Sequence, residues 1–373
     1  MYGPAMVDNP TNIYKTEFGI PIRNVWYMLM YAWGEALLNR FGELDDVENA
    51  PSLDALLASI LVKLIQQRMR IGLGRSYFDE KLLAEGIRGR INFIDSLKHQ
   101  TFERGQVYCD THQFSLNVPK NQILRSTLDK LVQIGDFGPD IKMANELRHQ
   151  IRWLTRQMDG IDLIELKQDF IHRQNLGRND RDYQVMLFVC ELILQRHMPS
   201  ETGGDIRLPS INKDAQVMHR VYERFIACFY QYHLDGWKVT PQSRLKWFES
   251  NTSKYLPVMQ PDLLLQEKKS RRIIILDTKF TAKSLIENQW GKVGFDSSHL
   301  YQLFTYLKTQ EHLSEQNQNA TGILLYPTIN QTNISEEIGL QNLTIRIETV
   351  DLAAPWEEIE YQLLKILKYN VAT

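Results

Sequence analysis

The spacing of apolar residues changes several times along the chain, and each change predicts a different kind of element. Residues 22–41 are apolar on most sides, which predicts a buried helix with Asn24 as its N-cap. Residues 51–69 show a second helical pattern, and Ser52 stands at its start as a cap. Between Tyr77 and Val118 apolar residues alternate over short stretches, which is typical of strands. Further helices are predicted at residues 121–133, 141–158 and 182–197.

A segment rich in Pro, Gly and Ser at residues 199–209 predicts a linker, and the pattern changes after it. The elements expected beyond it are helices at residues 214–232, 298–309 and 356–369 and strands within residues 237–250, 258–267, 272–280, 322–327 and 343–350. This order predicts a compact α/β core around a central mixed sheet. The whole chain is therefore expected to be α+β, with one domain at about 1–205 and a second at about 206–373.

Composition and charge narrow the classes of function. Lys and Arg number 43 against 45 Asp and Glu, so the net charge is -2 and any contact with nucleic acid must be local or assisted by a partner. The three cysteines lie apart in apolar settings, as expected of reduced core thiols rather than zinc ligands. No apolar run approaches the roughly 20 residues of a spanning helix, and no signal peptide is visible. The protein is therefore expected to be cytoplasmic, without a membrane partner.

One acid-x-lysine tripeptide differs from the four others in the chain by its position. Asp277 and Lys279 directly follow four aliphatic residues, 273–276, that a sheet would bury on both faces. Because side chains in a strand alternate, Asp277 and Lys279 point to the same side. The preceding predicted strand carries Asp262 after Pro261, and an antiparallel pairing of the two strands would bring Asp262 next to Asp277.

Two carboxylates side by side at a buried sheet edge are costly unless a cation lies between them. Oxygen ligands in that arrangement suit Mg²⁺ or Mn²⁺. Lys279 on the same face could orient an attacking water or stabilise charge that develops on a phosphate. The alternative is a plain salt bridge between Lys279 and one of the acids, and the tripeptide alone does not decide between the two.

Three further side chains are candidates for the same site. Glu223 lies on the helix that opens the C-terminal core, although a solvated Glu paired with Arg220 or Arg224 is the alternative. Gln302 and Tyr306 lie four residues apart on one face of a helix, where they could hydrogen-bond a carboxylate or a phosphate. An ordinary amphipathic helix explains that pair equally when it is judged alone.

Taken together, these residues resemble the PD-(D/E)xK nuclease superfamily. Pro261-Asp262 followed by Asp277-Thr278-Lys279 matches its motif, Glu223 fits its upstream acid, and Gln302-xxx-Tyr306 fits the QxxxY element of its RecB-like branch. Residues 20–34, 86–93, 300–307 and 322–327 are also similar to the McrC family, the nuclease subunits of McrBC methylation-dependent restriction systems.

The resemblance implies a function that composition and periodicity do not show. It implies Mg²⁺- or Mn²⁺-dependent cleavage of double-stranded methylated DNA, with Asp262, Asp277, the Thr278 carbonyl and Glu223 around the metal. It also implies an N-terminal region that binds a hexameric McrB-like AAA+ GTPase, inserts partly into its ring and stimulates its GTP hydrolysis. The chain has no GxxxxGK[ST] loop and so is not itself the P-loop motor. The alternative function is a non-catalytic adaptor with a nuclease fold that only binds and activates the GTPase.

Local concentrations of basic residues are candidates for phosphate or partner contacts. The turn at residues 268–272 is expected beside the metal site, where it could follow DNA phosphates. Residues 68–75, with Arg88 and Arg90, fall in the N-terminal region and could face the ring instead. Solvated turns are the alternative for each group.

Overall fold

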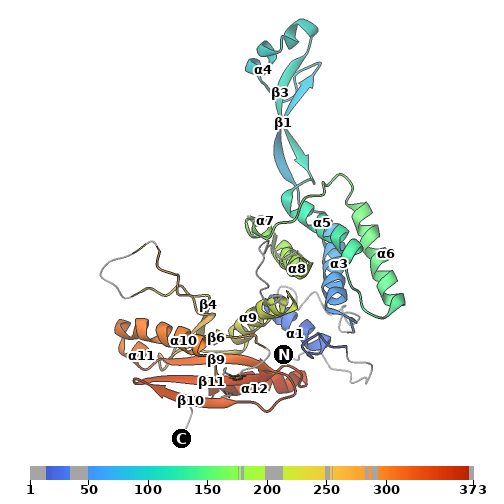
Figure 1. The fold of residues 1–373 in the computed structure, drawn as a ribbon. Helices are drawn as coiled ribbons and strands as arrows, with labels where there is room; N and C mark the ends of the chain where they lie inside the picture. Colours follow the sequence, from blue (N-terminus) through green and yellow to red (C-terminus); the bar gives the residue numbers. More distant parts are fainter. Residues whose placement is uncertain are drawn as a thin grey trace, which may run out of the picture. The chain divides into compact units, whose positions relative to one another are not determined.

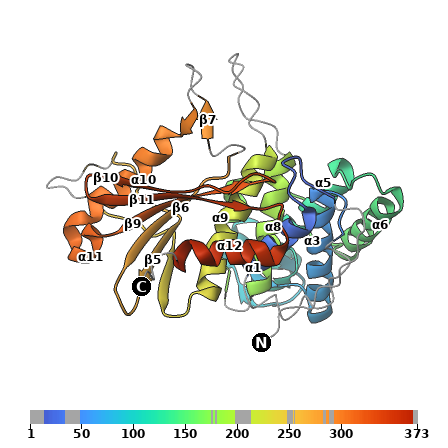
Figure 2. The same cartoon turned by 90° about the horizontal axis from the view of Figure 1, so that it is seen from below.

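The structure is a computed structural model and is organised in two compact units. It describes residues 14–33, 49–174, 176–177, 180–197, 213–247, 253, 255–281, 285–287 and 293–368. The first unit joins residues 1–56 to residues 200–373, and the second covers residues 57–199. Figures 1 and 2 show the elements of each unit.

The first unit is built on a mixed sheet. Within the described residues this sheet has six strands in the order β10-β11-β9-β6-β5-β4. Strands β6 and β9 are parallel, as are β9 and β11, whereas β4, β5 and β10 each pair antiparallel with their neighbours. The strands are β4 (Trp237–Pro241), β5 (Leu263–Glu267), β6 (Ile273–Thr278), β9 (Thr321–Thr328), β10 (Ser335–Leu340) and β11 (Leu343–Asp351). The predicted central mixed sheet is confirmed.

Helices cover the sheet because its central strands are apolar on both faces. Every residue of β6 and of β9 is buried. Helix α10 (Ser297–Gln310) packs against β9 at Gly322, where a Cβ would come within 2.8–2.9 Å of Leu303 and Leu307 side chains. Helix α9 (Lys213–His233) contacts α12 (Trp356–Lys368) through Tyr230, whose hydroxyl donates to the Leu363 carbonyl at 2.9 Å. Figure 2 shows α12 running along the sheet. This unit also contains β7 (Leu285–Glu287), β8 (Val293–Phe295), η4 (Glu311–Leu313) and α11 (Glu315–Gln318).

Helix α1 (Ile22–Trp33) belongs to the same unit as the C-terminal sheet. Asn24 is not the N-cap that the sequence predicts. It lies inside the helix and is buried, and its side-chain amide donates to the Leu352 carbonyl at 2.8 Å and to the Ala354 carbonyl at 3.0 Å. The predicted boundary at residues 205/206 places α1 in the N-terminal domain, whereas the structure places it in the unit with the C-terminal sheet. An apolar helix is buried against whichever surface fits it, and that surface can come from a distant part of the chain.

The second unit combines helices with a long antiparallel hairpin. The helices are α3 (Leu53–Ile71), whose first residues lie in the first unit, α5 (Pro119–Ile134), α6 (Ile141–Gln157), α7 (Gln168–His172) and α8 (Arg181–His197). Ser52 caps α3 as predicted, since its hydroxyl accepts from the Ala55 amide at 3.0 Å. The hairpin pairs β1 (Ser76–Ala84) with β3 (Val107–Ser115), and its tip holds β2 (Arg90–Ile91), α4 (Phe93–Lys98) and η2 (Thr101–Arg104) (Figure 1).

Strands alone are predicted between residues 77 and 118, but the tip of the hairpin contains a helix. Asn92 caps α4 by accepting from the Asp95 amide at 3.0 Å, a local signal that a period-two pattern hides. At Gly89 the backbone takes φ +84°, and a Cβ would meet the Asp110 carbonyl oxygen at 2.6 Å. The tip therefore requires glycine at this position.

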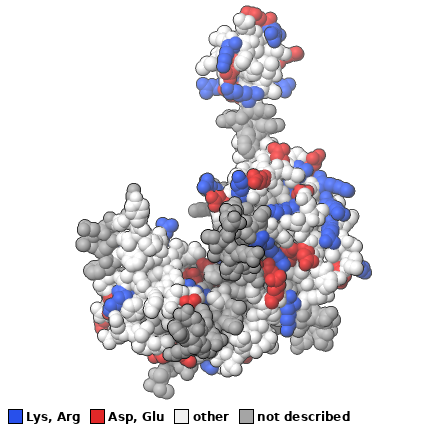
Figure 3. All heavy atoms as spheres, in the orientation of Figure 1, with Lys and Arg blue, Asp and Glu red and all other residues white. Residues whose placement is uncertain are grey.

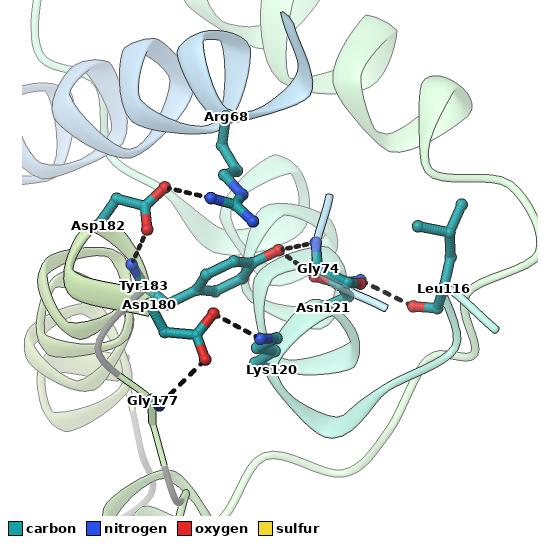
Figure 4. Close-up of polar contacts among 9 residues, drawn as sticks. All are labelled: Arg68, Gly74, Leu116, Lys120, Asn121, Gly177, Asp180, Asp182 and Tyr183. Carbon is teal, nitrogen blue, oxygen red and sulfur yellow. Dashed lines mark hydrogen bonds and ion pairs between the residues drawn. The ribbon is translucent and has the colours of Figure 1, made fainter. Parts of the chain in front are cut away.

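A buried hydrogen-bond network fixes the root of the hairpin (Figure 4). The Tyr183 hydroxyl donates to Asn121 Oδ1 at 2.6 Å and accepts from the Gly74 amide at 2.8 Å. The Asn121 amide donates to the carbonyls of Gly74 and Leu116, at 2.8 and 2.7 Å. Gly74 precedes β1 and Leu116 follows β3, so one asparagine holds both strands to α5 and α8.

Two ion pairs flank the same tyrosine ring (Figure 4). Arg68 lies 3.1 Å from Asp182, and Lys120 lies 2.7 Å from Asp180. Their cationic groups stand 5.0 and 4.6 Å from the centre of the Tyr183 ring. Such contacts stabilise a buried aromatic ring, so these charges have a structural role in the root.

The face of the molecule seen in Figure 3 carries basic and acidic side chains intermixed, as the net charge of -2 suggests. No helix within the described ranges is long and apolar enough to cross a membrane. The predicted linker at residues 199–209 lies outside the described residues.

Candidate active site

The candidate site forms where β5 begins and β6 ends. The two strands pair antiparallel with Leu263 opposite Leu276, which brings Asp262 beside the end of β6. Oδ2 of Asp262 accepts hydrogen bonds from the amide and the hydroxyl of Thr278, at 2.7 and 2.5 Å. The structure therefore brings Asp262, Asp277 and Thr278 together, as the strand pattern suggests.

Burial and mutual repulsion act on both carboxyl groups. The pKa of Asp277 is raised to about 6, first because the group is buried and then because Asp262 is close. The pKa of Asp262 is also raised, by burial and by the charge of Glu223, while hydrogen bonds from Thr278 oppose the change. Each ionised carboxylate therefore costs free energy that a cation in this site would offset.

Lys279 connects this acid pair to α10. Its ammonium lies 2.6 Å from Oδ2 of Asp277 and donates to Oε1 of Gln302 at 2.8 Å. Nε2 of Gln302 donates in turn to the Tyr306 hydroxyl at 2.8 Å. The plain ion pair considered from the sequence is thus present. One ammonium, however, faces two buried carboxyl groups, so it cannot compensate both if both ionise.

Glu223 reaches the site from α9 through Gln242. The Gln242 side chain donates to Oε1 of Glu223 at 2.8 Å, and its backbone amide donates to the Asp262 carbonyl at 2.8 Å. Glu223 also lies 4.0 Å from His219. The Arg224 guanidinium donates to the Ala32 carbonyl at 2.8 Å.

Two residues near the site are missing from the sequence-based prediction. Gln242 is one, and its backbone adopts φ 45° directly after β4. His299 is the other: its Nδ1 lies 2.9 Å from the Tyr326 hydroxyl, and its Nε2 lies 3.8 Å from Asp296. Burial and the nearby Lys279 lower the pKa of His299. Its position three residues before Gln302 is the signal in the sequence that could have identified it.

The donor set fits a hard divalent cation held by few protein ligands. Oδ2 of Asp277 is buried, and its contact within the described part of the chain is the Lys279 ammonium at 2.6 Å. The described residues contain no group of three His, Cys, Asp or Glu side chains that could hold a metal ion, so Glu223 does not assemble with Asp262 and Asp277 into a three-acid site. Mg²⁺ commonly binds through one or two carboxylates and keeps water ligands, which matches an acid pair.

The basic turn at residues 268–272 does not lie at this end of the sheet. It joins the end of β5 to the start of β6, whereas Asp262 precedes β5 and Asp277 lies near the end of β6. Five residues of strand separate the turn from the acids, about 17 Å. The expectation that this turn lies beside the site is wrong, because a hairpin places its turn at the end opposite the outer termini of its strands.

These features place the chain in a class of mixed α/β proteins that carry a buried pair of acids and a lysine at one end of two paired central strands, here β5 and β6. Residues 21–327 match the family described as McrBC 5-methylcytosine restriction system component. The chain belongs to this family, and the resemblance to McrC seen in the sequence is confirmed.

Known proteins agree with this assignment. The chain is 29% identical over 351 residues to the type IV methyl-directed restriction enzyme EcoKMcrBC of Escherichia coli strain K12, covering 93% of this chain and 97% of that protein. The fold is similar to a chain of the Thermococcus gammatolerans assembly of McrB AAA+ hexamers with bound McrC. That similarity has a TM-score of 0.52 and 14% identity, and it covers 94% of this chain and 76% of the other.

Proposed function

We propose that this chain is the DNA-cleaving subunit of a McrBC-type restriction system, with a PD-(D/E)xK active site at the end of β6. The observation that carries the proposal is the acid pair Asp262 and Asp277 with Lys279 joined to it. Its substrate is double-stranded methylated DNA, and it acts in the cytoplasm. Family membership and the relative's name support the restriction function.

Asp262, Asp277 and the Thr278 carbonyl would hold Mg²⁺ or Mn²⁺, and Glu223 would act from α9 as an outlying third acid held by Gln242. When bound, the cation supplies Lewis-acid stabilisation of charge on the phosphate. Lys279 orients the attacking water and stabilises negative charge on the phosphoryl oxygens. The water oxygen gives up a proton to solvent and bonds to phosphorus as one phosphodiester P–O bond breaks, and the leaving oxygen takes up a proton from solvent. Gln302 and Tyr306 hold the Lys279 ammonium in position through their hydrogen bonds.

The test separates DNA cleavage from activation of the partner. Asp277→Ala and Lys279→Ala are each expected to reduce cleavage by at least about 100-fold, the loss typical of removing one electrostatic group. Stimulation of the partner's GTPase should persist in both variants. Lys269→Ala is the matched control, because Glu267-x-Lys269 has the same spacing at the opposite end of β5. Cleavage that persists in both site variants would disprove the active-site assignment.

The second candidate function is the non-catalytic adaptor. It predicts that the acid pair has no role as a metal site. Calorimetry with Mg²⁺ or Mn²⁺ distinguishes the two, since binding should occur in the wild-type chain and disappear in Asp277→Ala. The geometry favours the catalytic function, because Lys279 can compensate only one of the two buried carboxylates and the second charge is left for a cation.

The partner we propose is a hexameric McrB-like AAA+ GTPase, whose GTP hydrolysis this chain stimulates. The solved complex with a similar fold contains McrB AAA+ hexamers. The hairpin of the second unit offers a surface for such a contact, since Ile87, Phe93, Ile94 and Leu97 expose 61–80% of their area at its tip. Exposed apolar clusters of this kind mark protein interaction sites.

A further inference from the structure

A short two-limbed segment beside the acid pair carries basic residues that neither the fold nor the proposed chemistry uses. Its limbs are residues 243–247 and 255–260, called here the ribbon. The Leu245 amide donates to the Met259 carbonyl at 2.9 Å, and the Trp247 indole donates to the Pro257 carbonyl at 2.7 Å. These bonds join the two limbs at their base.

The ribbon is fixed to the helix that carries Gln302 and Tyr306. The Gln310 side-chain amide donates to the Lys246 carbonyl at 2.9 Å, and the Thr309 hydroxyl lies 3.5 Å from the Met259 sulfur. Leu245 and Trp247 pack against the core between α10 and the sheet. The base of the ribbon therefore has a fixed position relative to the site.

The ribbon starts next to Glu223 and Asp262. Gln242, the residue before it, is hydrogen-bonded to both Glu223 and Asp262. Arg244 and Lys246 stand two and four residues further on, which corresponds to about 7 and 13 Å of extended chain.

The two cations alternate with the residues that face the core. Leu245 and Trp247 are partly buried, whereas Arg244 and Lys246 are exposed. No ion pair to either cation is found among the described residues. A charge of this kind keeps its full capacity to bind an anion.

We propose that Arg244 and Lys246 bind backbone phosphates of duplex DNA next to the bond that is cleaved. This inference rests on the proposed function, because a phosphodiester at the acid pair brings its neighbouring phosphates to the ribbon. Each strand of duplex DNA carries one phosphate per about 3.4 Å of helix axis, so the phosphates that flank the cleaved bond fall within the 7–13 Å reach of the two residues. Contacts of this type position the duplex without reading its sequence.

The experiment compares two charge-reversed pairs of residues. One pair lies on the ribbon, before β5, and the other lies in the turn after β5. Arg244→Glu/Lys246→Glu should weaken binding of a fluorescent methylated duplex, measured by anisotropy with EDTA, by at least about tenfold. The slope of log K against log salt should fall by about 1.8, close to 0.9 for each lost phosphate contact. Lys268→Glu/Lys269→Glu changes charge by the same amount at the distant turn and should leave both quantities as in the wild-type chain.

The neutral pair Arg244→Gln/Lys246→Gln should also weaken duplex binding, by a smaller factor than the charge-reversed pair. Circular dichroism should show that all variants are folded. Unchanged duplex binding in the ribbon variants, or an equal loss in the Lys268/Lys269 control, would overturn the inference. So would a wild-type chain without measurable affinity for the duplex. Unchanged duplex binding with lost GTPase stimulation would assign the ribbon to the protein partner instead. A wild-type complex that binds but does not cleave DNA would count against the proposed function alone.

Discussion

At the scale of single residues, the acid pair is expected to make stability depend on pH. The pKa of Asp277 is raised from 3.8 to about 6 in the folded protein, mainly by burial. The folded chain therefore holds this proton to a higher pH than the unfolded chain does. Consequently the free energy of unfolding should fall as pH rises from about 4 to about 6, and stay lower above it.

Asp277→Asn cannot ionise, so it should not show this fall. In metal-free buffer its stability relative to the wild-type chain is expected to grow by about 2 kcal/mol between pH 4 and pH 8, as measured by urea unfolding. Asp296→Asn should behave oppositely, because hydrogen bonds from Ser298 lower the pKa of Asp296 and its carboxylate stabilises the fold as pH rises. Parallel pH profiles for Asp277→Asn and the wild-type chain would contradict the raised pKa.

At the scale of elements, α1 is a part of the unit that holds the candidate site. Its residues Val25, Trp26, Met28 and Leu29 are at most 2% exposed. The turn before it also reaches the site, since the ring of Phe18 lies 5.6 Å from that of Phe280, the residue after Lys279. A fragment of residues 206–373 would lack these contacts.

Asn24→Ala tests the attachment of α1. The change leaves the Leu352 and Ala354 carbonyls without their amide donor, which should cost about 1–3 kcal/mol. Hydrogen exchange of the β9 and β11 amides should become faster by the corresponding factor. Asn319→Ala removes an exposed asparagine from the same unit and should change stability by less than about 0.5 kcal/mol. Equal effects of the two changes would argue against α1 as an integral part of this unit.

At the scale of the whole molecule, the two compact units are expected to divide the proposed tasks. The acid pair belongs to the first unit, and the exposed apolar tip belongs to the second. Activation of the partner and binding of the metal should therefore be separable by mutation.

Ile94→Asp/Leu97→Asp places two charges on the apolar tip and should greatly reduce stimulation of the partner's GTP hydrolysis. Binding of Mg²⁺ by calorimetry should be unchanged, because the acid pair lies in the other unit. Lys98→Ala, an exposed polar position on the same helix, is the control and should keep both activities. Full GTPase stimulation by the charged tip would show that the partner binds elsewhere.

Local pattern accounts for much of what was predictable. The helices now labelled α3, α5, α6, α8, α9, α10 and α12 follow apolar spacing that is strong over many residues. Strand β10 was missed, because five of its six residues are exposed and its pattern carries little apolar signal. The sequence pattern also does not predict the position of α1, which depends on contacts with residues more than 300 positions away. It does not predict α4 in the hairpin tip either, because that helix depends on the single cap Asn92.

The sequence by itself determined the central mixed sheet, the family resemblance and the candidate acids at residues 262 and 277, because strand period and motif order are local properties. Only the tertiary structure decided what surrounds those acids. Antiparallel pairing of β5 and β6 placed the turn at residues 268–272 at the far end, and the ribbon put Arg244 and Lys246 next to the acidic cluster. Side chains far apart in sequence meet through packing and burial, and those interactions cannot be read from the spacing of residues along the chain.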